Sequence, residues 1–283
     1  MQASGELTTP SRVKKGIITF LVLTLALSTI GWILAIATDE VPVLLLYAPG
    51  IAALVTRFLY QRNFRDLGWG WGGSTGSRLA LLAYAMPLAI AVVIYGATWL
   101  IVQGAWSSDD GAGANLTSFL VAASAGVVFN CLFAFGEELG WRGFLVPELA
   151  KLTNFSNTVL ISGLIWAFWH FPLIFFAAEL FEFSETPLWF AVPSFTLIIV
   201  IVSVVFTWLR LMSGSVWSAV ILHASHNNFS LGLFADRTSE SGAAPYIVTE
   251  VGVGLLIAWV VIAYLFWRKR SQLPVASASP STA

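Results

Sequence analysis

Eight stretches of mostly apolar residues follow one another along the chain, each about as long as a bilayer is thick. A transmembrane helix needs about 20 such residues, and the loops between the stretches are too short to hold a soluble domain. We therefore expect membrane-spanning helices over 16–38, 43–60, 79–102, 117–136, 157–178, 189–209, 215–234 and 246–267.

Composition supports a membrane protein and excludes other classes. Of 283 residues, 58% are hydrophobic and only 10% are charged, whereas about 25% is usual for charged residues in soluble proteins. A net charge of −1 without a long basic run argues against nucleic acid as the main partner. The single Cys131 excludes an internal disulfide framework and a thiolate-based zinc site. The sequence predicts an all-α, polytopic bundle, located in the plasma membrane if the host is a prokaryote.

Charge placement predicts the orientation of this bundle. If the N-terminus lies inside, thirteen of the 14 Lys and Arg residues fall in inner segments and only Arg237 falls outside. This is the asymmetry of the positive-inside rule, so we expect both termini in the cytoplasm. Most acidic residues belong to the outer segments: Asp39, Glu40, Asp109, Asp110, Glu179, Glu182, Glu185, Asp236, Glu240 and Glu250.

The chain divides into four expected regions. Residues 1–114 carry the first three helices, 115–235 carry a core of the next four, and 236–270 carry the last helix. Residues 271–283 are rich in Ser, Pro and Ala and are expected to be a disordered tail. We expect the first span to be a retained anchor, because its apolar run exceeds the roughly 7–15 residues of a signal peptide.

Few ionisable side chains fall within the expected spans, and all three histidines are among them. Such groups cost at least a few kcal/mol each in a bilayer, so they are functional candidates. They lie around the fourth span and within the fifth and seventh: Glu137, Glu138, Arg142, His170, His223 and His226.

The two neighbouring glutamates have different expected partners. Glu138 and Arg142 are four residues apart on one helix, with the acid first, which favours an ion pair of a structural kind. Glu137 points roughly 100° away from that pair. It therefore needs another partner, such as water, a histidine or a cation.

The histidines also have neighbours at helical spacing. Trp166 precedes His170 by one turn and is expected to wall in its ring, although His170 could instead only bond a backbone carbonyl. Asn227 follows His223 by four residues on the same face, and His226, offset by about 60° from His223, could be a mere neighbour. Glu137 and His223 both fall in the inner half of their spans, which is compatible with one pocket that opens to the cytoplasm.

These residues resemble the motifs of a known family. Glu-Glu-Leu-Gly-Trp-Arg-Gly-Phe-Leu (137–145) looks like the EExxxR motif of the CPBP, or Abi, intramembrane proteases, which process prenylated CAAX proteins or bacteriocins. His170 resembles the second motif, FxxxH, with Trp166 where the family usually has Phe, and His223 with Asn227 resembles the third, HxxxN. The resemblance covers roughly 115–235.

The resemblance implies hydrolysis of a peptide bond in a membrane-associated peptide or lipidated protein. Glu137 would be the general base, His170 would orient water, and His223 with Asn227 would stabilise the oxyanion. Glu138 and Arg142 would hold the site together. For Trp166, which keeps the aromatic bulk, we expect altered packing rather than lost chemistry.

Other interpretations remain open on the sequence. The same residues permit a zinc site with His170, His223 and Glu137 as ligands, although we favour glutamate chemistry without a metal or other cofactor. Rival functions are a non-catalytic immunity or interaction protein, a transporter, and haem ligation by His170 and His223. The oligomeric state does not follow from the sequence.

Overall fold

The computed structural model describes residues 9–107, 116–180, 186–239 and 242–274. Within these ranges the regular structure is helical, apart from an isolated antiparallel bridge between Trp106 and Thr238. Residues 275–283 of the expected tail lie outside the described residues, whereas residues 269–272 form a short 3-10 segment, η7 (Lys269–Gln272).

Three long helices make up the first third of the chain. They are α1 (Pro10–Thr38), α2 (Val43–Gln61) and α3 (Gly73–Ile101), with the short 3-10 turn η1 (Arg65–Leu67) before the third. The first and third begin six residues earlier than their apolar runs, because polar residues continue each helix beyond the apolar part. Thr9 caps the first helix by accepting a hydrogen bond from the backbone N–H of Arg12.

The fourth expected span is part of a longer helix. Continuous helical structure runs through α4 (Leu116–Val121), the π-helical segment η2 (Ala122–Gly126), α5 (Val127–Glu138), the π-helical segment η3 (Leu139–Leu145) and α6 (Val146–Ala150). The expectation of an end at residue 136 was wrong, because the helix continues through the charged residues, which are buried by neighbouring helices.

The remaining helices return across the bundle. They are α7 (Phe155–Phe176), the 3-10 turn η4 (Ala178–Leu180), α8 (Leu188–Ser213), α9 (Trp217–His226), the π-helical η5 (Asn227–Leu233), the 3-10 turn η6 (Ala235–Arg237), α10 (Pro245–Val248) and α11 (Val253–Arg268).

Seven helices among the described residues are long and apolar enough to cross a membrane. The remaining expected span, 215–234, corresponds to α9, whose 10 residues run directly into the seven residues of η5. The combined segment of α9 and η5 is shorter than those seven helices. It is also more polar, because it carries His223, His226 and Asn227.

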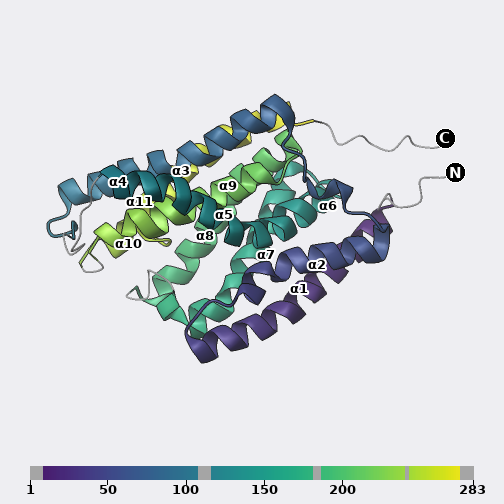
Figure 1. Cartoon of the computed structure of the whole chain (residues 1–283), viewed down its shortest axis with the longest axis horizontal. Coiled ribbons are helices and arrows are strands. Elements are labelled where there is room, and N and C mark those ends of the chain that lie inside the picture. The colour runs from purple at the N-terminus through teal and green to yellow at the C-terminus, as the bar shows by residue number, and fades with distance from the viewer. Residues whose placement is uncertain (1–8, 108–115, 181–185, 240–241, 275–283) are drawn as a thin grey trace.

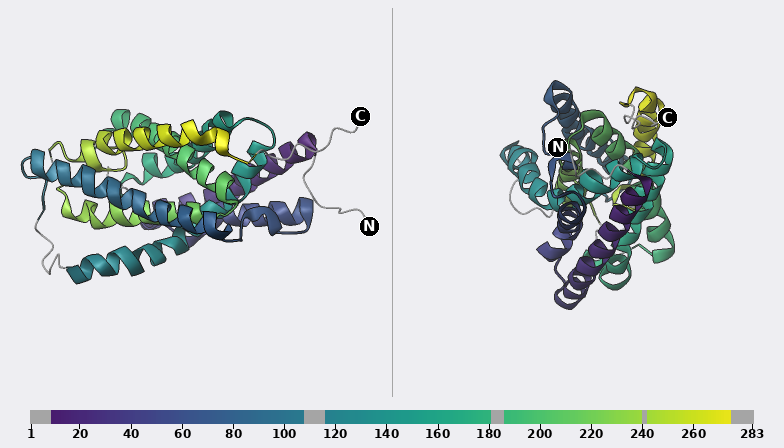
Figure 2. Two further views of the ribbon diagram at one scale, coloured as in Figure 1. Left: turned by 90° about the horizontal axis from the view of Figure 1, so that it is seen from above. Right: turned by 90° about the vertical axis from the view of Figure 1, so that its right-hand side faces the viewer.

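The long helices run lengthwise through the molecule (Figures 1 and 2). The start of α1 and the end of α11 lie at one end of the bundle, and α10 lies at the other (Figure 1). We call the first the basic end, since α1 begins near Arg12, Lys14 and Lys15 and α11 ends at Arg268. The opposite end holds Asp39, Asp236 and the connection from α10 to α11, and we call it the acidic end.

Helix α5 is central to the bundle, because it packs against both α2 and α9. Its approach to α2 is close: a Cβ on Gly136 would lie 2.6 Å from the carbonyl oxygen of Leu46, and one on Gly50 would lie 2.6 Å from that of Gly136. Small residues at such crossings let helix backbones approach in membranes. The contact fixes the end of α5, where the acidic pair stands.

Candidate active site

The candidate residues come from three helices that meet in the middle of the bundle. Glu137 and Glu138 are the last two residues of α5, His170 lies in the second half of α7, and His223 lies in α9. Asn227 is the first residue of η5. A π-helical segment therefore follows both the acidic pair and the last histidine, and such segments often occur at functional sites.

Glu137 is buried and has a specific partner. Its side chain is 6% exposed, and its Oε2 accepts a hydrogen bond from the indole Nε1–H of Trp166 at 3.0 Å. Trp166 thus does more than pack against the site, because Phe could not supply this donor. The bond orients one carboxylate oxygen of Glu137 and joins α5 to α7.

Glu138 forms the expected ion pair and also contacts a histidine. Arg142 Nη1 donates to Glu138 Oε1 at 2.8 Å, and His223 Nδ1 lies 2.9 Å from the same oxygen. A carboxylate can only accept, so His223 donates from Nδ1. Since Glu138 is fully buried, this arrangement fixes the orientation of the His223 ring.

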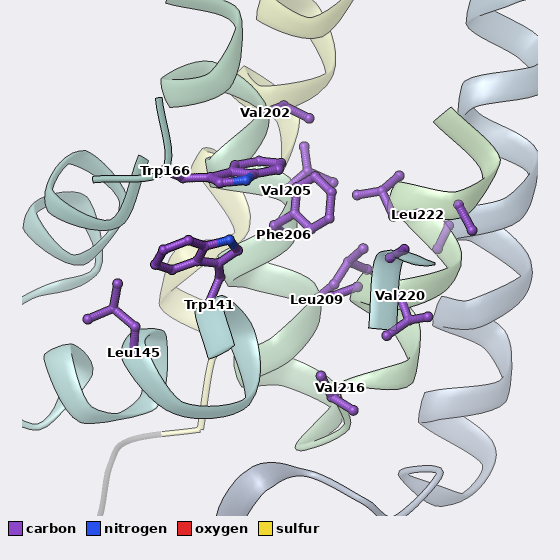
Figure 3. Packing of buried hydrophobic residues seen from close by; sticks show 14 of the residues in the cluster. Trp141, Leu145, Trp166, Val202, Val205, Phe206, Leu209, Val216, Val220 and Leu222 are labelled. Atoms are coloured by element: carbon purple, nitrogen blue, oxygen red, sulfur yellow. The ribbon is translucent and has the colours of Figure 1, made fainter. Parts of the chain in front are cut away.

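The guanidinium of Arg142 is held between two aromatic rings. Its central carbon lies 4.0 Å from the ring centroid of Trp166 and 4.0 Å from that of Phe206. Figure 3 shows Trp166 and Phe206 beside one another, with Trp141 below Trp166. Arg142 is 2% exposed, so these cation–π contacts and the Glu138 carboxylate replace its lost hydration.

His170 is oriented by the backbone of its own helix. Its Nδ1 lies 2.9 Å from the carbonyl oxygen of Trp166, and because a carbonyl only accepts, Nδ1 carries the proton. In the neutral ring Nε2 is then an acceptor. His170 thus forms the bond to a backbone carbonyl that the sequence allowed. Its ring also lines the cavity described next.

A cavity of about 130 Å³ connects these side chains, and we call it the reaction cavity. Its wall includes Glu137, His170, His223 and Asn227, together with Trp166. This volume can hold several water molecules. The structure thus brings the four side chains with proposed chemical roles to one polar hollow between α5, α7, α8 and α9.

Two further polar residues line the reaction cavity. His226 is part of the wall, and its buried Nδ1 has no hydrogen-bond partner among the described residues, while its ring packs on Trp259. Glu250 also lines it, although the sequence analysis placed Glu250 with the outer loop acids. Glu250 stands near the start of the expected last span, 246–267, and hydropathy alone could not show that its side chain turns inward.

The reaction cavity adjoins further empty space on the side of the acidic end. It shares wall residues with a larger cavity whose lining includes Asp236 and Arg237 at that end. Glu137 itself lies nearer the basic end of its helix, 13 residues before Ala150.

The zinc site that the sequence permits is not assembled in this arrangement. Among the residues that the structure describes, no three His, Cys, Asp or Glu side chains are grouped so that they could hold a metal ion. His170, His223 and Glu137 line one cavity but are not among such a group.

Comparison with known proteins identifies the region that contains the site. The family model described as "Type II CAAX prenyl endopeptidase Rce1-like" matches residues 120–229. A protein named CAAX prenyl protease 2 from Methanococcus maripaludis is 31% identical over 131 residues, which cover 45% of this chain and 45% of that relative. The chain thus matches somewhat less than half the length of the relative.

The matched residues include every side chain with a proposed chemical role. The model spans the acidic pair, both site histidines and Asn227 but not Glu250. In the part of the chain that the structure describes, seven helices are long and apolar enough to cross a membrane, which agrees with a multi-pass integral membrane protein. Residues 120–229 are therefore similar to CAAX prenyl endopeptidases, and this region contains the candidate site.

Proposed function

We propose that this protein is an intramembrane endopeptidase that hydrolyses a peptide bond with water activated by Glu137. The observation that carries the proposal is the placement of a buried, oriented carboxylate in a hollow shared with His170, His223 and Asn227. A substrate carbonyl in this hollow would lie among a base and hydrogen-bond donors. The family supports proteolysis in general, and the glutamate mechanism is our inference.

In the proposed first step, Glu137 removes a proton from a water molecule whose oxygen attacks the peptide carbonyl. Trp166 holds one carboxylate oxygen, which leaves the other to accept the proton. His170 accepts a hydrogen bond from the same water through Nε2. General bases held in place in this way typically contribute 10²- to 10⁴-fold to a rate.

The oxyanion that forms needs donors close by. The Asn227 amide can donate directly. His223 already donates from Nδ1 to Glu138, so its Nε2 can donate only when the ring is an imidazolium, which Glu138 would balance. In the last step the proton on Glu137 passes to the leaving amine, and both products are released.

The substrate is a peptide or a lipidated protein at the membrane. The relative's name refers to CAAX prenyl proteins. A prenylated CAAX substrate for this chain is a more specific proposal, supported by that name alone. Peptide cleavage is the broader proposal and can be tested first.

The test compares Glu137→Gln with Glu148→Gln in purified protein reconstituted in liposomes with a peptide mixture. Glu148 is also buried, at 2% exposed, but it pairs with Lys151 away from the reaction cavity. We expect Glu137→Gln to abolish appearance of new peptide termini, measured by mass spectrometry, and Glu148→Gln to retain it. Cleavage by Glu137→Gln at the rate of the unaltered protein would refute the mechanism.

The same preparation decides between glutamate and metal chemistry. We expect cleavage to persist after chelation and the purified protein to hold less than stoichiometric zinc. Stoichiometric zinc together with loss of cleavage on chelation and recovery on zinc addition would contradict the metal-free mechanism. An immunity role without cleavage would instead leave protection against a bacteriocin intact in Glu137→Gln.

A further inference from the structure

The reaction cavity adjoins a second, larger cavity of about 620 Å³, which we call the entry cavity. Three residues line both cavities: Asn227, Leu231 and Glu250. These side chains therefore form the boundary between the two spaces. One of them, Asn227, is also the proposed oxyanion donor.

The entry cavity lies toward the acidic end of the bundle. Its wall includes Gly126 near the start of the long fourth helix, Leu180 just after α7, and Asp236 with Arg237 just after η5. In the view from above, the first turns of that fourth helix stand apart from the other helices (Figure 2). A path to Glu137 through this cavity therefore begins at the acidic end.

Toward the basic end, tightly packed side chains cover the site. Trp141, Phe144 and Leu209 are each at most 2% exposed. Arg210 Nε donates to the carbonyl oxygen of Arg142 at 2.8 Å, and its Nη2 donates to that of Asp66 at 3.1 Å, which joins the loop after α2 to the region beneath the ion pair. A peptide could reach Glu137 from this end only by breaking these contacts.

The charges predict which membrane face each end occupies. Thirteen of the 14 Lys and Arg residues lie at or toward the basic end, and the exception, Arg237, lines the entry cavity. By the positive-inside rule the basic end is cytoplasmic. Trp99 and Trp106 pack together near Arg237, with ring centroids 4.6 Å apart, and such aromatics are typical of a membrane–water interface.

We infer that the entry cavity admits an extracytoplasmic peptide segment, either free or next to a membrane span, rather than the cytoplasmic tail of a lipidated protein. The inference rests on the proposed function for the reaction itself. The membrane face from which the substrate enters is inferred from the cavities and the charges. The substrate backbone passes Glu250 and Leu231 and presents its carbonyl to Asn227 and Glu137.

Access from outside is tested by labelling introduced cysteines in intact cells with a membrane-impermeant maleimide. Cys131 is replaced by Ser in every variant, since it is a free thiol. Gly232→Cys places a thiol in the entry cavity, where a Cβ meets only Asn227 O at 3.7 Å. Gly70→Cys is the matched control, because a Cβ there meets nothing within 4 Å in an exposed loop at the basic end.

We expect Gly232→Cys to be labelled in intact cells and Gly70→Cys only after the membrane is permeabilised. The reverse pattern, or failure of Gly232→Cys to react even in detergent, would overturn the inference. Labelling does not require catalysis, so the same pattern in a Glu137→Gln background separates this inference from the proposed function.

The route itself is tested by activity after labelling. Each variant is compared before and after reaction of the purified protein with a bulky maleimide. We expect the adduct at Gly232→Cys to lose cleavage of a peptide that the unlabelled variant cleaves, and the adduct at Gly70→Cys to retain it. Full cleavage by the Gly232→Cys adduct would show that the substrate takes another path.

Discussion

Trp166 donates its indole N–H to Oε2 of Glu137 across a distance of 3.0 Å, between residues 29 positions apart in the chain. The family usually has Phe at this position, which has the ring but no donor. In this protein the same ring also lies 5.6 Å from that of His223 and 5.9 Å from that of His170. One side chain thus contacts three of the groups proposed to act on the substrate.

Replacing Trp166 with Phe is expected to lower kcat/KM by about 10- to 100-fold. A hydrogen bond to a charged group contributes about 1.5–3 kcal/mol, and each 1.4 kcal/mol is tenfold in rate. The matched control is Trp169→Phe, which loses an indole bond to Ser28 Oγ instead and also keeps a ring beside His170. Equal losses in the two variants would contradict a specific role for the bond to Glu137.

Asn227 and Asn228 are adjacent residues with separable expected roles. Asn227→Ala should lower kcat by roughly 10²–10³-fold, as loss of one oxyanion donor does, with little change in melting temperature. Asn228 donates to the carbonyl oxygen of Ala122 at 3.1 Å and lies away from the reaction cavity wall. Asn228→Ala should therefore lower the melting temperature, measured by thermal unfolding. The rate of peptide cleavage per folded molecule should change little.

Arg142→Met is expected to destabilise the protein strongly. Removing one partner of a buried ion pair costs about 3–5 kcal/mol, because the other charge stays buried without compensation. Lys151→Met removes the partner of the buried Glu148, but the Lys151 side chain is 40% exposed, so water screens this pair and its loss is expected to cost less than the loss of a fully buried pair. Thermal unfolding in detergent should rank the two variants in this order, and a similar melting temperature for both would argue against a structural role of Arg142.

Gly136→Ala is expected to lower thermal stability and to impair cleavage. A methyl group there would meet Leu46 O at 2.6 Å and the Cα of Tyr47 at 2.9 Å, so α2 and α5 must move apart next to Glu137. Gly96→Ala in α3 is the control, since its Cβ would meet nothing within 4 Å. Ala favours a helix by roughly 0.5–1 kcal/mol over Gly, so the control should hold or gain stability, and a matching loss in both variants would refute the crossing argument.

The apolar stretches predicted the helices well because length and hydropathy suffice to define a membrane span. The Glu138–Arg142 ion pair could also be predicted from the sequence, since residues four apart on a helix face each other. The sequence from Leu116 to Ala150 is almost uninterrupted apolar and too long for one span, but its length alone did not show that one helical stretch runs to Ala150 with its charges buried against neighbouring helices. The π-helical turns at Leu139 and Asn227 left no periodic signal in such short segments.

The contacts that build the site could not be predicted, because they depend on how distant helices pack. Nothing in the local sequence shows that Trp166 turns its N–H toward Glu137 or that His223 shares an oxygen of Glu138 with Arg142. The side from which the cavity is reached did not follow from the sequence either, because the depth of Glu137 along its helix says nothing about which neighbouring helices diverge. The assignment of both termini to the cytoplasm stays a prediction.

Glu250 reaches the reaction cavity from a segment that follows the 120–229 region shared with the family. The side chains with proposed chemical roles lie within residues 120–229, whereas Glu250, which lines the same cavity, comes from a later stretch of the chain. Proteins that share the hydrolytic core can keep the same reaction while their last helix and the turn before it diverge. Selectivity among peptides can then change through substitutions near Glu250 without any change in the residues that act on the bond.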